Sequence, residues 1–160
     1  MQASAFNEDQ FFRAIAGSGA RALLIGRRAL VALGLPVLTA DYDFWVHPDD
    51  MASFNEAVKP YVLHLNHPPE EARKRGRYVL ENDERVDVLV ARALSTVDGK
   101  DVRFDDLWAR RQTLELAAEV RVAIPSLEDL ILTKRFAARA KDAEDIRLLE
   151  ALRKKQARGA

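Results

Sequence analysis

Apolar and polar residues follow two kinds of pattern along this chain, and each pattern predicts its own type of element. Short runs that are wholly apolar, or that alternate apolar and polar residues between turn residues, predict strands. A polar turn, ENDE, separates two alternating runs and makes one hairpin especially clear. We expect buried strands at residues 20–26 and 40–46, hairpins at residues 77–91 and 112–125, and an edge strand at residues 61–67.

Helices are predicted where apolar residues recur at helical spacing behind a capping residue. Asn7 has the spacing of a capping box with Gln10, and Ser126 has it with Asp129. The last helix carries one apolar stripe. The segment at residues 68–76 fits either a loop or a fragment of helix. The expected helices lie at residues 7–19, 27–36, 47–61, 104–111, 126–140 and 141–155.

This order of elements predicts an α/β (α+β) fold. Helices and strands alternate first, hairpins follow, and two helices close the chain, which indicates a short mixed sheet packed with helices and a C-terminal helical pair. A length of 160 residues fits one compact domain over residues 1–160. We expect its core at about residues 20–150 and a basic tail over residues 153–160.

Composition excludes several classes of protein. The 25 basic residues balance the 25 acidic ones, so net charge does not indicate a general nucleic-acid binder. The absence of cysteine excludes disulfides, thiol nucleophiles and cysteine zinc sites. The sequence shows no signal peptide, and no apolar run approaches the ~20 residues that span a bilayer. We therefore expect a cytoplasmic protein with no membrane partner, and the abundant Ala and Arg favour a bacterial source.

Three aspartates are the candidate reactive groups. Asp41 and Asp43 in TADYDFWV are two residues apart, so on a strand they share a face and repel. Asp87 in RVDVLV lies between valines that would face the core. If the two strands are neighbours, the three carboxylates converge, and such oxygen ligands suit hard divalent cations. The spacing alone leaves an alternative open, in which Asp41 is a turn residue and Asp43 a solvated strand residue.

A glycine upstream of the aspartates suggests a phosphate site. Gly26 ends an apolar strand and opens a helix, where backbone N–H groups and the helix dipole can hold phosphate. Arg27 and Arg28 add positive charge to the same turn. Taken alone, Gly26 fits an ordinary tight turn better than a phosphate site.

These motifs resemble the nucleotidyltransferase (polymerase-beta-like) superfamily. LLIGRRALVALGLPVLTADYDFWV matches its signature of an apolar strand, a glycine, a helix and Asp-x-Asp, followed by a third acidic residue on a later strand. Gly26, Asp41, Asp43 and Asp87 match by position. SLEDLILTKRFAARAKDAEDI resembles the end of the abortive-infection and toxin–antitoxin branch, and its matching residues are Ser126, Lys134, Arg139, Lys141, Asp142 and Asp145.

The resemblance implies a minimal nucleotidyltransferase fold and a metal-dependent reaction. A nucleoside monophosphate would pass from a nucleoside triphosphate to an acceptor hydroxyl on an RNA end or a protein. Asp41 and Asp43 would bind two Mg²⁺ (or Mn²⁺) ions, and Asp87 would bind the catalytic ion and help deprotonate the acceptor. Gly26 and Arg27 would hold phosphate and Lys134 would reach the triphosphate. A toxin role with a cognate antitoxin-like partner is also implied.

One departure from the family pattern keeps a second hypothesis open. The family has a second small residue after the glycine, and this chain has Arg27. A non-catalytic module that uses the same groove to bind a protein or RNA is therefore the alternative.

Other residues of the resemblance also have structural interpretations. Lys134 could lie at the surface, and Arg139, Lys141, Asp142 and Asp145 could form a helix cap with an ion pair instead of contacting phosphate. The basic run at residues 70–77 could touch RNA, but a solvated loop is favoured.

Overall fold

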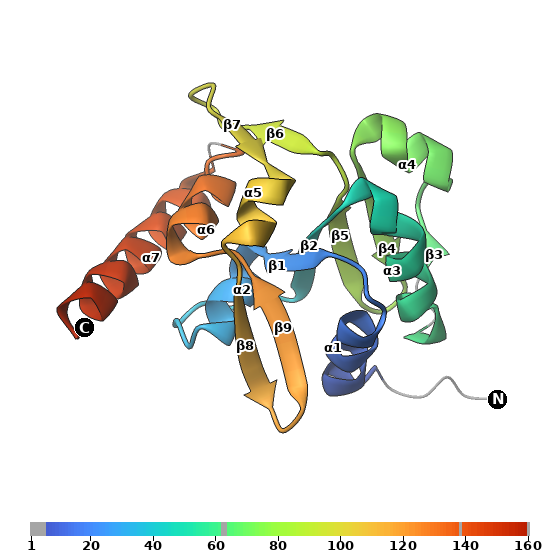
Figure 1. Cartoon of the computed structure of the whole chain (residues 1–160), viewed down its shortest axis with the longest axis horizontal. Helices are drawn as coiled ribbons and strands as arrows, with labels where there is room; N and C mark the ends of the chain where they lie inside the picture. Colours follow the sequence, from blue (N-terminus) through green and yellow to red (C-terminus); the bar gives the residue numbers. More distant parts are fainter. Residues whose placement is uncertain (1–5, 62–63, 138, 160) are drawn as a thin grey trace.

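The protein is built on a five-stranded mixed sheet with strand order β1-β2-β5-β4-β3 (Figure 1). The computed structural model describes residues 6–61, 64–137 and 139–159. Strands β2 and β5 run parallel, and the other neighbouring pairs are antiparallel. In spatial order the strands are β1 (Ala22–Ile25), β2 (Asp41–Val46), β5 (Arg85–Leu89), β4 (Arg77–Glu81) and β3 (His64–Leu65).

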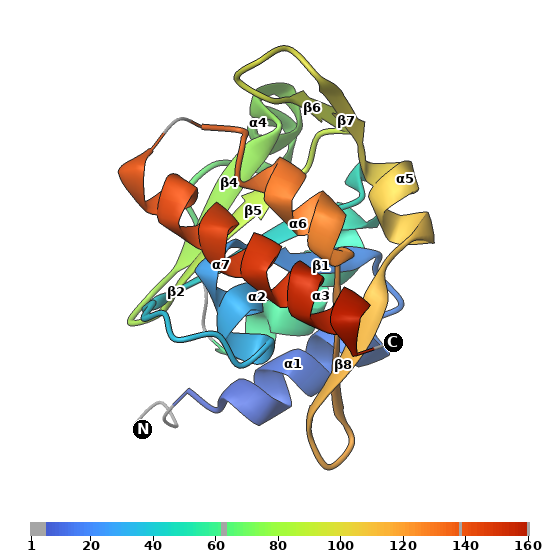
Figure 2. The ribbon, with the colours of Figure 1, turned by 90° about the vertical axis from the view of Figure 1, so that its left-hand side faces the viewer.

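Helices pack around this sheet, so the expected mixed α/β class is confirmed. Helices α6 and α7 lie against each other and form the expected C-terminal pair (Figure 2). The helices are α1 (Glu8–Gly17), α2 (Gly26–Ala32), α3 (Met51–Val58), α4 (Pro69–Arg75), α5 (Phe104–Ala109), α6 (Leu127–Thr133) and α7 (Ala140–Arg158), with short 3-10 helices η1 (Pro48–Asp50) and η2 (Lys59–Tyr61).

One face of the sheet is buried in the main core. Alternate residues of β2 and β5, among them Phe44 and Val88, point into this core and are fully buried. Phe11 of α1 and Phe54 of α3 each lie near Phe44, with ring centroids 6.2 Å and 5.4 Å away. Burying one such side chain contributes about 1.5–3 kcal/mol. This packing fixes the strand register, because a slip of one residue would move the whole apolar set to the other face.

The opposite face of the sheet is only half covered. Leu23, Ile25 and Trp45 pack there against α5 in a second, smaller core. The indole N–H of Trp45 donates to the carbonyl oxygen of Ala91 at 2.8 Å, so its polar atom is satisfied. The uncovered half carries the polar residues of β2 and β5, and it becomes the floor of the candidate site.

Two further hairpins lie outside the main sheet. The predicted hairpin at residues 112–125 is present as β8 (Gln112–Ala117) and β9 (Val120–Ile124), and β9 packs against α1 and β1. A second ribbon, β6 (Ala93–Ser95) with β7 (Asp101–Arg103), was not predicted. Its strands are too short to show an alternating pattern.

Several element boundaries differ from the sequence prediction. The segment at residues 68–76 contains a true helix, which Gly76 ends in the left-handed conformation at φ 74°. The helix expected at residues 126–140 ends at Thr133, although Ser126 caps it as predicted by accepting from the N–H of Asp129. Parts of three predictions lie outside the described residues: residues 62–63 of the edge strand, residue 138 of this helix and residue 160 of the basic tail.

Candidate active site

A cavity of about 780 Å³ lies over the uncovered half of the sheet. Its floor comes from β2, β5 and β4, and the turn between β1 and α2 borders it. The segment that links α6 to α7 supplies another wall. A cavity of this size is typical of small-molecule sites.

The register of β2 and β5 brings the candidate aspartates onto this floor. Asp43 faces Asp87 directly across the two parallel strands, and Asp41 faces Arg85. Side chains two apart on a strand share a face, so Asp41, Asp43 and Asp87 all line the cavity. The residues flanking Asp87, Val86 and Val88, are buried in the core, as expected.

Asp43 has a perturbed pKa. Burial, and then repulsion from Asp87, raises the pKa of Asp43 to about 6. No hydrogen-bond donor among the described residues reaches the Asp43 carboxylate. The half-buried carboxylate of Asp43 and the neighbouring carboxylate of Asp87 together fit a hard divalent cation. A bound cation would offset both their repulsion and the lost hydration of Asp43.

Gly26 is required by its backbone and by its neighbour. Its φ is 69°, in the left-handed region. A Cβ added there would collide with the carboxylate of Asp43. The turn between β1 and α2 therefore packs directly against the Asp43 side chain, and the sequence pattern did not indicate this contact.

The Arg85 side chain binds the Asp87 carboxylate in this structure. The Arg85 guanidinium donates from Nε to Oδ2 and from Nη2 to Oδ1 of Asp87, both at 3.1 Å. Both side chains remain accessible, at 50% and 35% exposure. In this arrangement no three carboxylate or imidazole groups within the described ranges are placed to hold one metal ion together. The predicted convergence of all three aspartates on a metal stays a prediction.

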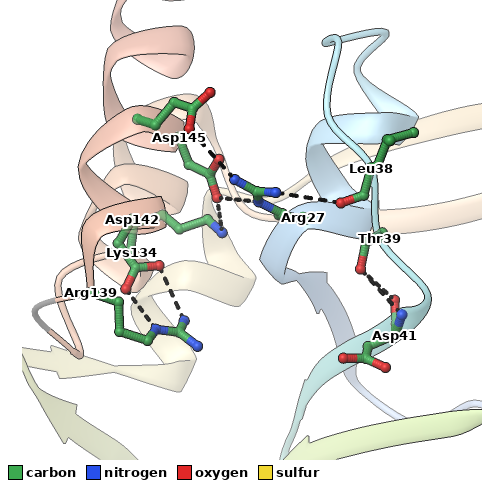
Figure 3. Close-up of polar contacts among 9 residues, drawn as sticks. Arg27, Leu38, Thr39, Asp41, Lys134, Arg139, Asp142 and Asp145 are labelled. Atoms are coloured by element: carbon green, nitrogen blue, oxygen red, sulfur yellow. Dashed lines mark hydrogen bonds and ion pairs between the residues drawn. The ribbon is translucent and has the colours of Figure 1, made fainter.

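Lys134 is buried and belongs to an ion cluster with Asp145 and Arg27 (Figure 3). Lys134 Nζ lies 2.8 Å from Asp145 Oδ2, and Arg27 Nε donates to the same oxygen at 3.2 Å. Asp145 is fully buried, and its Oδ1 has no partner in the described structure. The alternative of a surface lysine is therefore wrong. Arg27 Nη2 also lies 4.0 Å from Glu144 Oε2, so two cations face two carboxylates beside the cavity.

The remaining predicted residues divide between the cavity and the helix junction. Arg139 and Lys141 line the cavity. Arg139 also binds both oxygens of buried Asp142, at 2.8 Å and 3.1 Å, which is the predicted ion pair (Figure 3). Arg28 was expected to add positive charge to the turn at Gly26, but its side chain lies elsewhere. Its guanidinium lies over the Tyr42 ring, 4.1 Å from the centroid.

Comparison with solved structures shows which fold this is. TM1012 of Thermotoga maritima, provisionally assigned as a nucleotidyltransferase, matches with a TM-score of 0.54 at 14% identity, over 93% of this chain and 89% of its own. The chain has a nucleotidyltransferase fold. The antibiotic-resistance factor ANT(2'')-Ia also matches, with a TM-score of 0.56 at 17% identity, over 88% of this chain and 78% of its own. No family model and no curated protein matches the sequence.

This nucleotidyltransferase fold also brings to the cavity residues that were not predicted as site residues. Arg75, Arg77 and Arg85 line the cavity beside the aspartates. The position of Arg85 follows from the same two-residue period that places Asp87, so the sequence carried a signal for it. Arg75 and Arg77 could be found only once α4 and β4 had been placed.

Proposed function

We propose that the protein transfers a nucleoside monophosphate from a nucleoside triphosphate to an acceptor hydroxyl. The observation that carries the proposal is the cross-strand pair of Asp43 and Asp87 on the floor of a cavity that basic side chains surround. The nucleotidyltransferase fold supports it. An acidic centre suits metal ions and a basic wall suits a triphosphate, and the reaction needs both.

Asp41, Asp43 and Asp87 would hold Mg²⁺ or Mn²⁺. When bound, such ions neutralise charge on the attacking and leaving oxygens of a phosphoryl group. The raised pKa of Asp43 supports this assignment, because a carboxylate that is costly to ionise alone gains from a cation beside it.

The chain's own residues would bind the triphosphate and handle the proton. Lys134 and Arg27 would bind the phosphates next to the Gly26 turn. The acceptor oxygen would attack the α-phosphorus while Asp87 takes its proton. A new oxygen–phosphorus bond forms, the bond to the oxygen that bridges the α- and β-phosphates breaks, and pyrophosphate leaves.

One contact favours the non-catalytic alternative. Arg85 binds both oxygens of Asp87, so its positive charge competes with a metal ion for that carboxylate. If that contact persists with nucleotide bound, the protein is a binding module that keeps the fold. The toxin role and the antitoxin-like partner stay predictions from the resemblance.

Thermal unfolding with ATP, CTP, GTP or UTP, each with and without Mg²⁺, tests the proposed function. A nucleotide present at 100 times its Kd stabilises the native state by about 2.7 kcal/mol, which raises the Tm of a chain of this size by about 5–10 °C. We expect this rise only with Mg²⁺, and we expect Asp87→Asn to abolish it. Asp83→Asn, an exposed change in the β4–β5 turn, is the matched control. A rise that persists without Mg²⁺ would support the binding module instead.

A further inference from the structure

Basic side chains line the cavity on both sides of the aspartates. The α2, α6 and α7 side provides Arg27, Lys134, Arg139 and Lys141. The β5, β4 and α4 side provides Arg85, Arg77 and Arg75. The proposed function uses the first side for the triphosphate. Nothing in it yet uses Arg75 and Arg77.

Strand order separates the two sides. Gly26 follows β1, the aspartates lie on β2 and β5, and Arg77 lies on β4, beyond them. Arg77 is two residues before Val79, the cross-strand partner of Asp87, so the side chains of Arg77 and Asp87 share a face. Neighbouring strands are about 4.8 Å apart, so β4 lies about 10 Å from β2. A group held by Arg77 would therefore lie on the Asp87 side, away from the triphosphate.

These two arginines are available for a ligand. Within the described residues, the Arg77 side chain makes no hydrogen bond or ion pair. Arg75 binds Glu71, four residues earlier on α4, at 2.9 Å, and both side chains are about half exposed. An exposed pair of this kind contributes only about 0.3–0.5 kcal/mol, so an incoming anion can replace it. Arginine suits phosphate because its guanidinium can donate two parallel hydrogen bonds.

The positive charge also extends beyond the cavity. Arg73 and Lys74 are exposed on α4, directly before Arg75. The basic run predicted as a solvated loop is thus a helix that leads to the cavity rim. A row of charges that continues past the site suits an extended polyanion better than a single phosphate group.

We infer that the acceptor is a nucleic-acid strand, and that Arg75 and Arg77 bind the phosphate next to its reactive hydroxyl. The inference rests on the proposed function, and it names the acceptor by its phosphodiester chemistry. RNA and DNA share that chemistry, so both are tested. A protein acceptor without phosphate would leave these two arginines without a ligand.

The test is fluorescence anisotropy of labelled 12-nucleotide single strands, one of RNA and one of DNA. We expect Arg75→Gln/Arg77→Gln to weaken binding of the preferred strand at least tenfold. Each neutralised phosphate of a single strand contributes about 0.7 to the slope of log affinity against log salt concentration, so losing the one phosphate held by both arginines should reduce that slope by about 0.7. The matched control, Arg121→Gln/Arg153→Gln, removes two exposed arginines that do not line the cavity and should stay within twofold of wild type.

Calorimetric titration of the four nucleotides with Mg²⁺ separates the two possible failures. Nucleotide affinity should change less than twofold in the Arg75/Arg77 variant. Equal weakening in the control variant, or unchanged strand binding, overturns the inference. Failure of wild type to bind either strand, with nucleotide binding intact, also overturns it and leaves the proposed function standing. Loss of nucleotide binding in wild type contradicts the proposed function itself.

Discussion

Replacing Asp43 by Asn should make the metal-free protein more stable above pH 6. Burial and Asp87 together raise the pKa of Asp43 from 3.8 to about 6. The native state therefore holds a proton between these values that the unfolded chain has released, and stability falls as the pH rises through this window. Such a change in pKa corresponds to about 3 kcal/mol at neutral pH. Asn has nearly the same shape and carries no charge, so this cost disappears in the variant.

Urea denaturation at pH 4 and pH 7.5, in EDTA, measures the effect. We subtract the unfolding free energy of wild type from that of Asp43→Asn at each pH. This difference should be about 1–3 kcal/mol more favourable to the variant at pH 7.5 than at pH 4. Adding 10 mM Mg²⁺ should stabilise wild type and leave the variant unchanged. Asp83→Asn should follow wild type in every condition.

A structural role for Asp43 would give the opposite result. If its carboxylate satisfied buried donors, the Asn variant would lose about 1–3 kcal/mol in EDTA at pH 7.5. A variant weakened in this way, with its response to Mg²⁺ intact, would refute the reasoning about the paired aspartates.

Three other substitutions test the neighbouring contacts. Gly26→Ala should lower stability in urea by more than about 1 kcal/mol, because its Cβ would meet Asp43 at a strained φ; unchanged stability would contradict that close approach. Lys134→Met should cost at most about 3 kcal/mol, because buried Asp145 loses its nearest cation but keeps Arg27, and Lys134→Met/Asp145→Leu should recover most of this; no recovery would show that the pair is not the cause. Arg27→Ser should lower triphosphate affinity about tenfold in calorimetry, since the cavity loses one of the two cations proposed to bind phosphate and gains net negative charge from Asp145 and Glu144; unchanged affinity would place Arg27 outside the nucleotide site.

Local sequence patterns were enough to predict the floor of the site. The two-residue period placed Asp41 and Asp43 on one face, and Val86 with Val88 placed Asp87 facing away from the core. The same period applies to Arg85, but it does not reveal that Arg85 binds Asp87. That contact depends on which rotamer the long Arg85 side chain adopts on the exposed face of β5.

Contacts between distant segments could not be predicted in the same way. The ion pair of Lys134 with Asp145 joins α6 to α7 and depends on how these helices pack. Helix α6 ends without a glycine or proline in residues 134–140. Its end is set by tertiary contacts: the N–H of Val97 donates to the Arg135 carbonyl oxygen at 2.7 Å, and Phe136 packs edge-on against Trp45. No local pattern encodes such contacts.

Transfer of label from α-³²P nucleotides tests the central claim most directly. Each of the four nucleotides is incubated with the protein and Mg²⁺, either alone or with the 12-nucleotide strands, and the products are resolved on denaturing gels. The account predicts Mg²⁺-dependent labelling of a strand from at least one nucleotide, lost in Asp43→Asn and Asp87→Asn and retained in Asp83→Asn. Labelling that survives both active-site substitutions would contradict the assignment of this carboxylate pair. No labelling of strand or protein with any nucleotide would contradict the proposed transfer reaction.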